Sequence, residues 1–412
     1  MVDFPLFHRF YRDLEIVIIT SFIFFTISSC SSKNKNNHAQ SRLSKSEAIS
    51  HAKNSFNNFK SELMKERQKE MDSRQITVDG IKMKFDFQSF GEKPKGGWSL
   101  YFSLHGGGQT EPAVNEKQWV RHQNLYEVSE GIMFVPRSPT NTWNMWHQDH
   151  FVGGGPRVVQ LLRMLYEVDP NKVYLMGYSA GGDGVYQLAP RMADRFAAAA
   201  MMAGHPNETS PLGLRNLPFT IHMGKNDTPY NRNTVATEWK GKLKDLRNND
   251  PEGYPHLVTI HQDKGHWMEL LDTVAITWMS RYTRDPFPKK VVWKQDDVTH
   301  NRFYWLKDEN PTERSLIIAR IEGQTIEIEN TSVSYFTIML NDLLIDMDRS
   351  VIVKYDGKEI YNAIVPRTSM TILKSIREYG DPKSVYYGEI PISLDNITCL
   401  LYTSDAADEE RG

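Results

Sequence analysis

Cysteine is almost absent from this sequence, and so is any excess of one charge. The two cysteines, Cys30 and Cys399, lie far apart, and neither has a C-x-x-C neighbourhood. They are therefore a poor basis for a metal site or a disulfide framework. The formal net charge of −2 gives no reason to expect a nucleic acid or an acidic surface as partner. The chain is expected to bind no nucleic acid.

Long hydrophobic runs are also missing. The apolar run from Ile16 to Ile27 is shorter than the ~20 residues that a bilayer-spanning helix needs, and it fits the core of a signal peptide. It leads to Ile27-Ser28-Ser29-Cys30, which resembles a bacterial lipobox. We therefore expect residues 1–30 to be a lipoprotein-type signal peptide with Cys30 as the lipidated residue. An uncleaved N-terminal anchor is the alternative.

Both versions of the N-terminus lead to the same location. The polar residues 31–43 are expected to form a flexible tether. The protein is expected to be exported and anchored to a membrane, on the periplasmic or cell-surface side of a bacterial envelope.

The remaining composition is typical of a folded globular protein. Of the 412 residues, 40% are hydrophobic, and at ~150 residues per domain the length suggests two or three domains. The segment from Ser44 to Arg74 has helical composition, and the β-rich runs around Asp79-Gly80 predict a hairpin over Gln75–Ser89.

The next part of the chain alternates short apolar runs with helical stretches. Runs that are apolar on both faces predict a parallel sheet covered by helices on both sides. We expect residues 44–284 to form a doubly wound, mostly parallel α/β domain, with catalytic groups at the carboxyl ends of its strands. The expected strands are Trp98–Leu104, Ile132–Val135, Val173–Met176, Phe196–Met202, Phe219–Met223 and His256–His261.

The pattern changes after Arg284. Prolines mark a junction, and alternating strands then predict a small all-β, sandwich-like domain over residues 285–397. The last residues, 398–412, resemble a translated sequencing-adapter read-through, so we interpret them as a non-native tail in which Cys399 has no role. An ordinary acidic tail is the alternative.

A G-x-S-x-G motif gives the first catalytic candidate. Gly177-Tyr178-Ser179-Ala180-Gly181 follows the strand that ends at Met176 and opens a helix-like stretch. The motif alone is weak evidence, but the sequence around it provides the strand, turn and helix that a nucleophile elbow needs. Ser179 is therefore the predicted nucleophile, with a buried turn serine as the alternative.

A glycine-rich loop gives the second candidate. Leu104-His105-Gly106-Gly107-Gly108-Gln109 ends the first parallel strand, where backbone N–H groups can stabilise a developing oxyanion. We expect Gly107, Gly108 and Ala180 to form the oxyanion hole. No Gly-Lys-Ser/Thr follows, so a P-loop is excluded.

The base and the acid should follow the nucleophile along the chain. His266 lies late in the sequence, beside Gly265 and just after a strand, unlike the competing His205, His222 and His261. Asp227 follows the strand Phe219–Met223 and could orient the imidazole. Asp263 is the alternative acid, although it lies too near His266 for the usual arrangement on separate loops.

These motifs resemble those of the α/β-hydrolase superfamily, over about Trp98 to Arg281. The resemblance is greatest to secreted esterases of the polyhydroxybutyrate-depolymerase, feruloyl-esterase and carboxylesterase kind. It implies a Ser179–Asp227–His266 triad in the chain order of that fold, with no metal or organic cofactor. The chain shows no long lid insertion between Ser179 and Asp227, which argues against an interfacial lipase.

The resemblance also implies what the substrate is and what surrounds it. We expect carboxylic ester hydrolysis through an acyl-enzyme, on polysaccharide-linked or small acyl esters. A prolyl-oligopeptidase-like peptidase and a non-catalytic, membrane-tethered glycan-binding protein are the alternatives. The expected substrate-binding residues are His105, Gln109, Trp143, Trp146, Tyr178 and His205. For Trp143 and Trp146, which follow the strand Ile132–Val135, packing in the core is the alternative.

Overall fold

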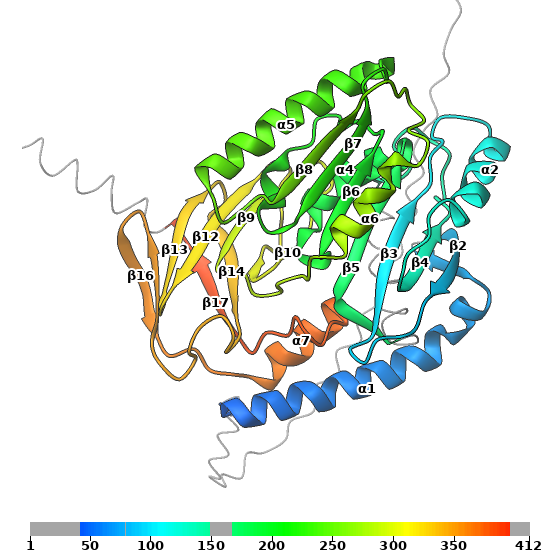
Figure 1. Cartoon of the computed structure of the whole chain (residues 1–412). Helices are drawn as coiled ribbons and strands as arrows, with labels where there is room; N and C mark the ends of the chain where they lie inside the picture. Colours follow the sequence, from blue (N-terminus) through cyan, green and yellow to red (C-terminus); the bar gives the residue numbers. More distant parts are fainter. Residues whose placement is uncertain (1–41, 79, 149–166, 396–412) are drawn as a thin grey trace, which may run out of the picture. The chain divides into compact units, whose positions relative to one another are not determined.

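The computed structural model describes residues 42–78, 80–148 and 167–395 (Figure 1). The predicted signal peptide with Cys30, most of the tether and the predicted tail with Cys399 lie outside these residues. The first element is helix α1 (Lys45–Asp72), which begins with a capping box. The backbone N–H of Ser44 donates to the Glu47 carboxylate, and the backbone N–H of Glu47 donates to the Ser44 hydroxyl. No helix in the described part is long and apolar enough to cross a membrane.

An eight-stranded sheet forms the centre of the first half of the chain. Its order is β1-β2-β4-β3-β5-β6-β7-β8. Six neighbouring strands, from β4 to β8, are parallel, and the predicted hairpin adds two antiparallel strands at one edge. The strands are β1 (Gln75–Val78), β2 (Ile81–Phe90), β3 (Trp98–Leu104), β4 (Gly131–Pro136), β5 (Val168–Tyr178), β6 (Ala198–Met202), β7 (Phe219–Gly224) and β8 (His256–His261). The predicted, mostly parallel sheet is confirmed.

Helices cover both faces of this sheet because its strands are apolar on both faces. In β3, Leu100 and Phe102 pack with α4 (Ala180–Arg191) and α5 (Arg232–Asn249), whereas Tyr101 between them packs with α6 (Val274–Met279) on the other face. Helix α2 (Pro112–Gln123) follows β3 directly. Short 3-10 turns complete the half at Ala193–Arg195, Pro211–Asn216, Pro229–Asn231 and Leu271–Thr273.

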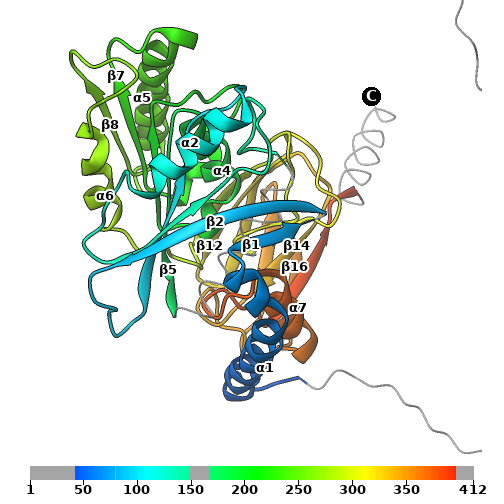
Figure 2. The same ribbon diagram turned by 90° about the vertical axis from the view of Figure 1, so that its right-hand side faces the viewer.

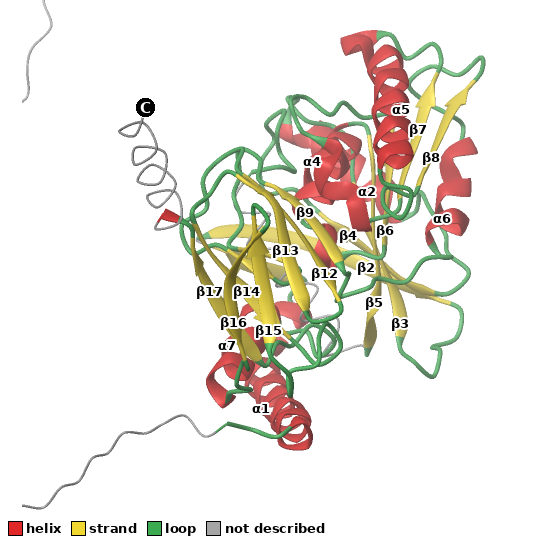
Figure 3. Ribbon diagram, turned by 90° about the vertical axis from the view of Figure 1, so that its left-hand side faces the viewer, coloured by secondary structure: helices red, strands yellow, loops and turns green. Residues whose placement is uncertain are grey.

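The second half of the chain holds two further sheets (Figure 3). One has the order β16-β15-β13-β12-β9 and the other β10-β11-β14-β17, and side chains from both join one buried cluster. The elements are β9 (Lys290–Lys294), β10 (Arg302–Phe303), β11 (Leu306–Lys307), β12 (Leu316–Glu322), β13 (Thr325–Thr331), β14 (Tyr335–Leu340), β15 (Val351–Tyr355), β16 (Lys358–Ala363), α7 (Ser369–Tyr379) and β17 (Gly388–Ser393). The sequence did not predict helix α7.

The two halves are closely joined. Helix α1, which we assigned to the catalytic domain, packs along α7 of the second half (Figure 2), where Ala48 and Ala52 meet Ile372 and Ile376. The described residues all belong to one compact unit. A boundary near Arg284 therefore marks a change of architecture inside a continuous core.

A buried ion pair joins the two halves of the chain. Arg284 and Asp381, 2% and 1% exposed, lie 2.7 Å apart. Arg284→Met removes this cation from the buried Asp381 carboxylate, so we expect the substitution to lower the free energy of unfolding by about 3–5 kcal/mol. Urea denaturation would measure this loss. The exposed pair of Arg320 and Glu322 supplies the control, because Arg320→Ala should change the same quantity by less than about 0.5 kcal/mol. Equal effects of the two variants would contradict the prediction.

Candidate active site

Ser179 lies in a sharp turn between strand β5 and helix α4. Its φ of 60° is in the left-handed region, which is rare for a residue with a side chain. The turn brings the helix so close to the sheet that a Cβ at Gly181 would overlap the Leu104 carbonyl oxygen. The small residues of the G-x-S-x-G motif are therefore required by packing, and the strained backbone presents the hydroxyl at the strand end.

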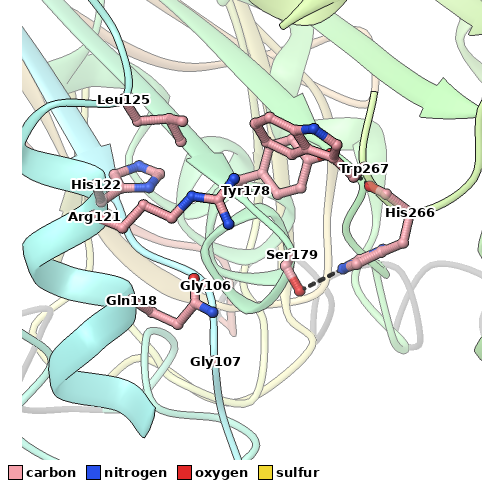
Figure 4. A pocket seen from close by; sticks show the side chains of 10 residues that line it. All are labelled: Gly106, Gly107, Gln118, Arg121, His122, Leu125, Tyr178, Ser179, His266 and Trp267. Carbon is pink, nitrogen blue, oxygen red and sulfur yellow. Dashed lines mark hydrogen bonds between the residues drawn. The ribbon is translucent and has the colours of Figure 1, made fainter. Parts of the chain in front are cut away.

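The structure brings Ser179, His266 and Asp227 together. The Ser179 Oγ lies 2.9 Å from His266 Nε2, and His266 Nδ1 lies 2.7 Å from Asp227 Oδ2 (Figure 4). Because a carboxylate can only accept, the Nδ1–H donates to Asp227 and Nε2 is left to accept the Ser179 proton. Asp227 is fully buried and His266 is partly exposed. The three groups come from loops after β5, β7 and β8, at one edge of the sheet.

Tyr178 fixes the loop that carries the histidine. Its hydroxyl donates to the His266 carbonyl oxygen and accepts the Met268 N–H at 3.0 Å. Burial raises the pKa of this phenol, so it stays a donor at all physiological pH values. We predicted substrate contact for Tyr178, and its ring does line a pocket beside Ser179.

Gly108, one of the three predicted oxyanion donors, uses its N–H for a hydrogen bond within the protein. The Gly108 N–H donates to Asn115 Oδ1 at 3.0 Å, and the Asn115 amide returns a hydrogen bond to the Gly108 carbonyl oxygen at 2.9 Å. The prediction of Gly108 as a donor was therefore wrong. Among the described residues, the N–H groups of Gly107 and Ala180 donate to no protein acceptor, and both residues line the space around Ser179. Asn115, which the sequence analysis missed, anchors this loop through both hydrogen bonds.

Two predicted substrate contacts are buried instead. His105 is fully buried, with its Nε2 accepting the Ser138 N–H at 3.1 Å. Trp146 is also fully buried, and its indole N–H donates to the His105 carbonyl oxygen at 2.9 Å. Both predictions were wrong because these side chains turn into the core, where their hydrogen bonds fix the backbone next to the glycine-rich loop.

Burial of His105 has a consequence for acid stability. Burial lowers the pKa of His105 to about 3, whereas an unfolded histidine titrates near ~6.5. Between these values the unfolded chain binds one more proton, so acidification favours unfolding. We expect the titration of this histidine to make the free energy of unfolding about 2 kcal/mol lower at pH 5 than at pH 7. The midpoints of urea unfolding at pH 5 and pH 7 should therefore differ less for His105→Gln than for wild type. If the two proteins showed the same difference, the prediction would be contradicted.

Two pockets meet at Ser179. The smaller, of about 170 Å³, lies between α2 and the His266 loop, and we name it the Arg121 pocket after a residue that lines it (Figure 4). The larger, of about 540 Å³, we name the Arg232 pocket. It contains three of the predicted substrate-binding residues, Gln109, Trp143 and His205. The Trp143 side chain is half exposed there, as expected of a ring that can contact substrate.

The Arg232 pocket also contains charges that the sequence analysis missed. Asp183 accepts the His205 N–H at 2.6 Å, and burial raises the pKa of its carboxyl to about 6. Arg232 lies 3.7 Å from Asp227 Oδ1, with only 12% of its side chain exposed. No sequence motif marks these residues, because folding brings them to the pocket from two helix starts that lie far apart in the chain.

The competing histidines and a metal site find no support in the described residues. His222 is buried and shares a 3.1 Å contact with His261, inside the sheet. Within residues 42–78, 80–148 and 167–395, no group of three or more His, Cys, Asp and Glu side chains could hold a metal ion. The expected absence of a cofactor stays a prediction.

Comparisons with known proteins agree with this geometry. Residues 141–266 match the model of the dienelactone hydrolase family. A bifunctional acetylxylan esterase/xylanase from Neocallimastix patriciarum is 31% identical over 154 residues, which are 36% of this chain and 21% of that protein. The chain thus spans about a fifth of this relative's length.

Two solved structures that are similar to this chain cover about half of it. A thermostable esterase has 18% identity and a TM-score of 0.40 over 51% of this chain and 62% of its own. The poly(3-hydroxybutyrate) depolymerase LpqC from Bordetella parapertussis has 14% identity and a TM-score of 0.38 over 51% and 90%. The matched segment contains Ser179, Asp227 and His266, so this part of the chain is similar to the dienelactone hydrolase family, and the predicted resemblance to α/β-hydrolases is confirmed.

Proposed function

We propose that the chain is a serine hydrolase that cleaves carboxylic esters through an acyl-enzyme. The observation that carries this proposal is the continuous hydrogen-bonded chain from Ser179 through His266 to Asp227, with distances of 2.9 and 2.7 Å. The family match over residues 141–266 supports an ester hydrolase.

The reaction follows from the arrangement of these groups. His266 Nε2 takes the Ser179 proton as Oγ attacks the ester carbonyl carbon, and Asp227 stabilises the imidazolium that forms. The N–H groups of Gly107 and Ala180 stabilise the negative oxygen of the tetrahedral intermediate, which then collapses and expels the alcohol with the proton from His266. Water hydrolyses the acyl-enzyme by the same steps, and Ser179 regains its proton.

The substrate and the location are part of the same proposal. The acetylxylan esterase activity in the relative's name and the exposed Trp143 beside Ser179 favour short acyl esters linked to polysaccharide. The lipobox-like sequence ending at Cys30 favours an exported protein held at a membrane by a lipid anchor.

A fluorophosphonate probe tests the mechanism directly. Wild type should be labelled and Ser179→Ala should not, since the probe reacts only with an activated serine. If wild type is labelled, enzyme that has not been treated with the probe should hydrolyse p-nitrophenyl acetate much faster than a peptide p-nitroanilide, whereas the reverse order would indicate a peptidase. Absence of labelling would overturn the proposal, and glycan binding by the whole chain would then be measured.

A further inference from the structure

The Arg121 pocket holds a cation, Arg121, that no carboxylate in the described part of the chain neutralises. Arg121 and Gln118 reach into it from helix α2, and Figure 4 shows both polar ends pointing toward the space beside Ser179. The Arg121 guanidinium lies 4.6 Å from the centroid of the Trp267 ring. This stacking holds the cation at the pocket wall while leaving its N–H groups free to donate at the edges.

Among the described residues, no aspartate or glutamate forms an ion pair with this cation or lines its pocket. The residues that line the Arg121 pocket include no aspartate or glutamate. In the described part of the chain, Arg121 forms no ion pair within 4.0 Å. His122, the other basic residue of α2 that lines the pocket, is fully buried, and burial lowers its pKa to about 3, so it is neutral near pH 7. The pocket therefore has one unpaired positive charge in front of the nucleophile.

The position of Arg121 in its helix does not explain this arrangement. Arg121 lies in the last turn of α2, where a cation is favourable next to the carbonyl groups of the helix end. Its guanidinium, however, extends away from the helix and over Trp267, which follows His266 directly in the chain. The guanidinium is therefore placed to bind a ligand in the pocket rather than the carbonyl groups at the end of α2.

The two pockets differ in charge balance. In the Arg232 pocket the cation has carboxylates near it, Asp183 in the lining and Asp227 at 3.7 Å. An anionic group there would meet acidic groups, whereas the lining of the Arg121 pocket includes no carboxylate. A guanidinium with a planar set of N–H groups matches the two oxygens of a carboxylate.

We propose that the Arg121 pocket is a subsite for an anionic group, so that the preferred ester carries a carboxylate bound by Arg121 and Gln118. This inference rests on the proposed ester hydrolysis and adds the charge of its substrate. The carboxylate belongs either to the acyl part, as in a monoester of a dicarboxylic acid, or to the alcohol part, as in an esterified hydroxy acid or uronic acid.

Two matched substrate pairs distinguish these sources. For the acyl part, 4-nitrophenyl hydrogen adipate is compared with its neutral methyl ester. For the alcohol part, 4-acetoxybenzoate is compared with methyl 4-acetoxybenzoate. In one of the pairs, Arg121→Gln should lower kcat/KM for the anionic member about tenfold and change the neutral member less than twofold. Arg121→Lys should restore part of the loss, and 0.5 M NaCl should reduce the preference of wild type because salt screens the attraction.

Lys117→Gln is the matched control, because Lys117 is an exposed cation of the same helix and does not line the pocket. This variant should leave kcat/KM unchanged for all four substrates. If Arg121→Gln slows anionic and neutral esters equally, or slows neither, the subsite is wrong while ester hydrolysis stands. If neither pair is hydrolysed by wild type in a Ser179-dependent manner, the proposed function itself is wrong.

Discussion

Ser179→Ala is expected to lower kcat for p-nitrophenyl acetate by about 10⁶-fold, the loss typical of removing the nucleophile of a serine triad. Without Oγ, the acyl group has no acceptor on the protein, so the oxyanion donors of Gly107 and Ala180 act only on direct attack by water. A residual rate above the uncatalysed reaction should remain from these donors. Initial rates at saturating substrate give the comparison.

The fold should tolerate this change. Alanine at position 179 keeps the backbone contact that fixes the turn, in which the Ser179 N–H donates to the Met202 carbonyl oxygen at 2.9 Å. The melting temperature should therefore stay close to that of wild type. Ser280→Ala provides the control, because this exposed serine lies at the end of α6, where its hydroxyl donates to the Thr277 carbonyl oxygen. If both variants retained the wild-type rate, Ser179 would not be the nucleophile.

The sheet and the residues at its edge could be predicted because their signals are local. The strand expected over Phe219–Met223 is found as Phe219–Gly224, and the turn residues after such strands must lie at the same edge of a parallel sheet. Ser179, Asp227 and His266 each follow a strand of this kind. Their meeting therefore follows from chain order and topology, without knowledge of any side-chain contact.

Side-chain direction is what the sequence could not supply. His105 and Trp146 lie in the expected loops, but both turn inward and bond to backbone groups of the oxyanion region. Gly108 lies in the expected motif, yet its N–H is taken by Asn115, seven residues further on. Composition and periodicity place a residue on an element, but they do not say which of two neighbouring cavities it faces.

Contacts between elements that are distant in the chain could not be predicted from the sequence either. The Arg121 pocket is formed by α2 and by the loop after β8, and nothing in either segment alone indicates that Arg121 and Trp267 stack. The packing of α1 on α7 has the same character, since each helix shows an apolar stripe whose partner cannot be deduced from its own sequence.

Asp227→Asn is expected to lower kcat by about 10⁴-fold while leaving the fold intact. An amide at this fully buried position has nearly the shape of the carboxylate, but its NH₂ group can donate to His266 Nδ1. The imidazole would then carry its proton on Nε2, where it faces Ser179 and cannot accept the hydroxyl proton. The loss of negative charge also removes the stabilisation of the imidazolium in the transition state. Single-turnover rates with p-nitrophenyl acetate would measure the acylation step, at which the defect should be found.

Asp263→Asn separates this role from that of the alternative acid. Asp263 lies three residues before His266 and is exposed, whereas the carboxylate bonded to His266 Nδ1 at 2.7 Å is that of Asp227. The Asp263 variant should therefore retain kcat within about threefold. A large loss in Asp263→Asn together with near-normal turnover in Asp227→Asn would reverse the assignment of the acid. Because both substitutions remove one negative charge from the same edge of the sheet, a difference between them reports the bond to the imidazole and not the general electrostatic field.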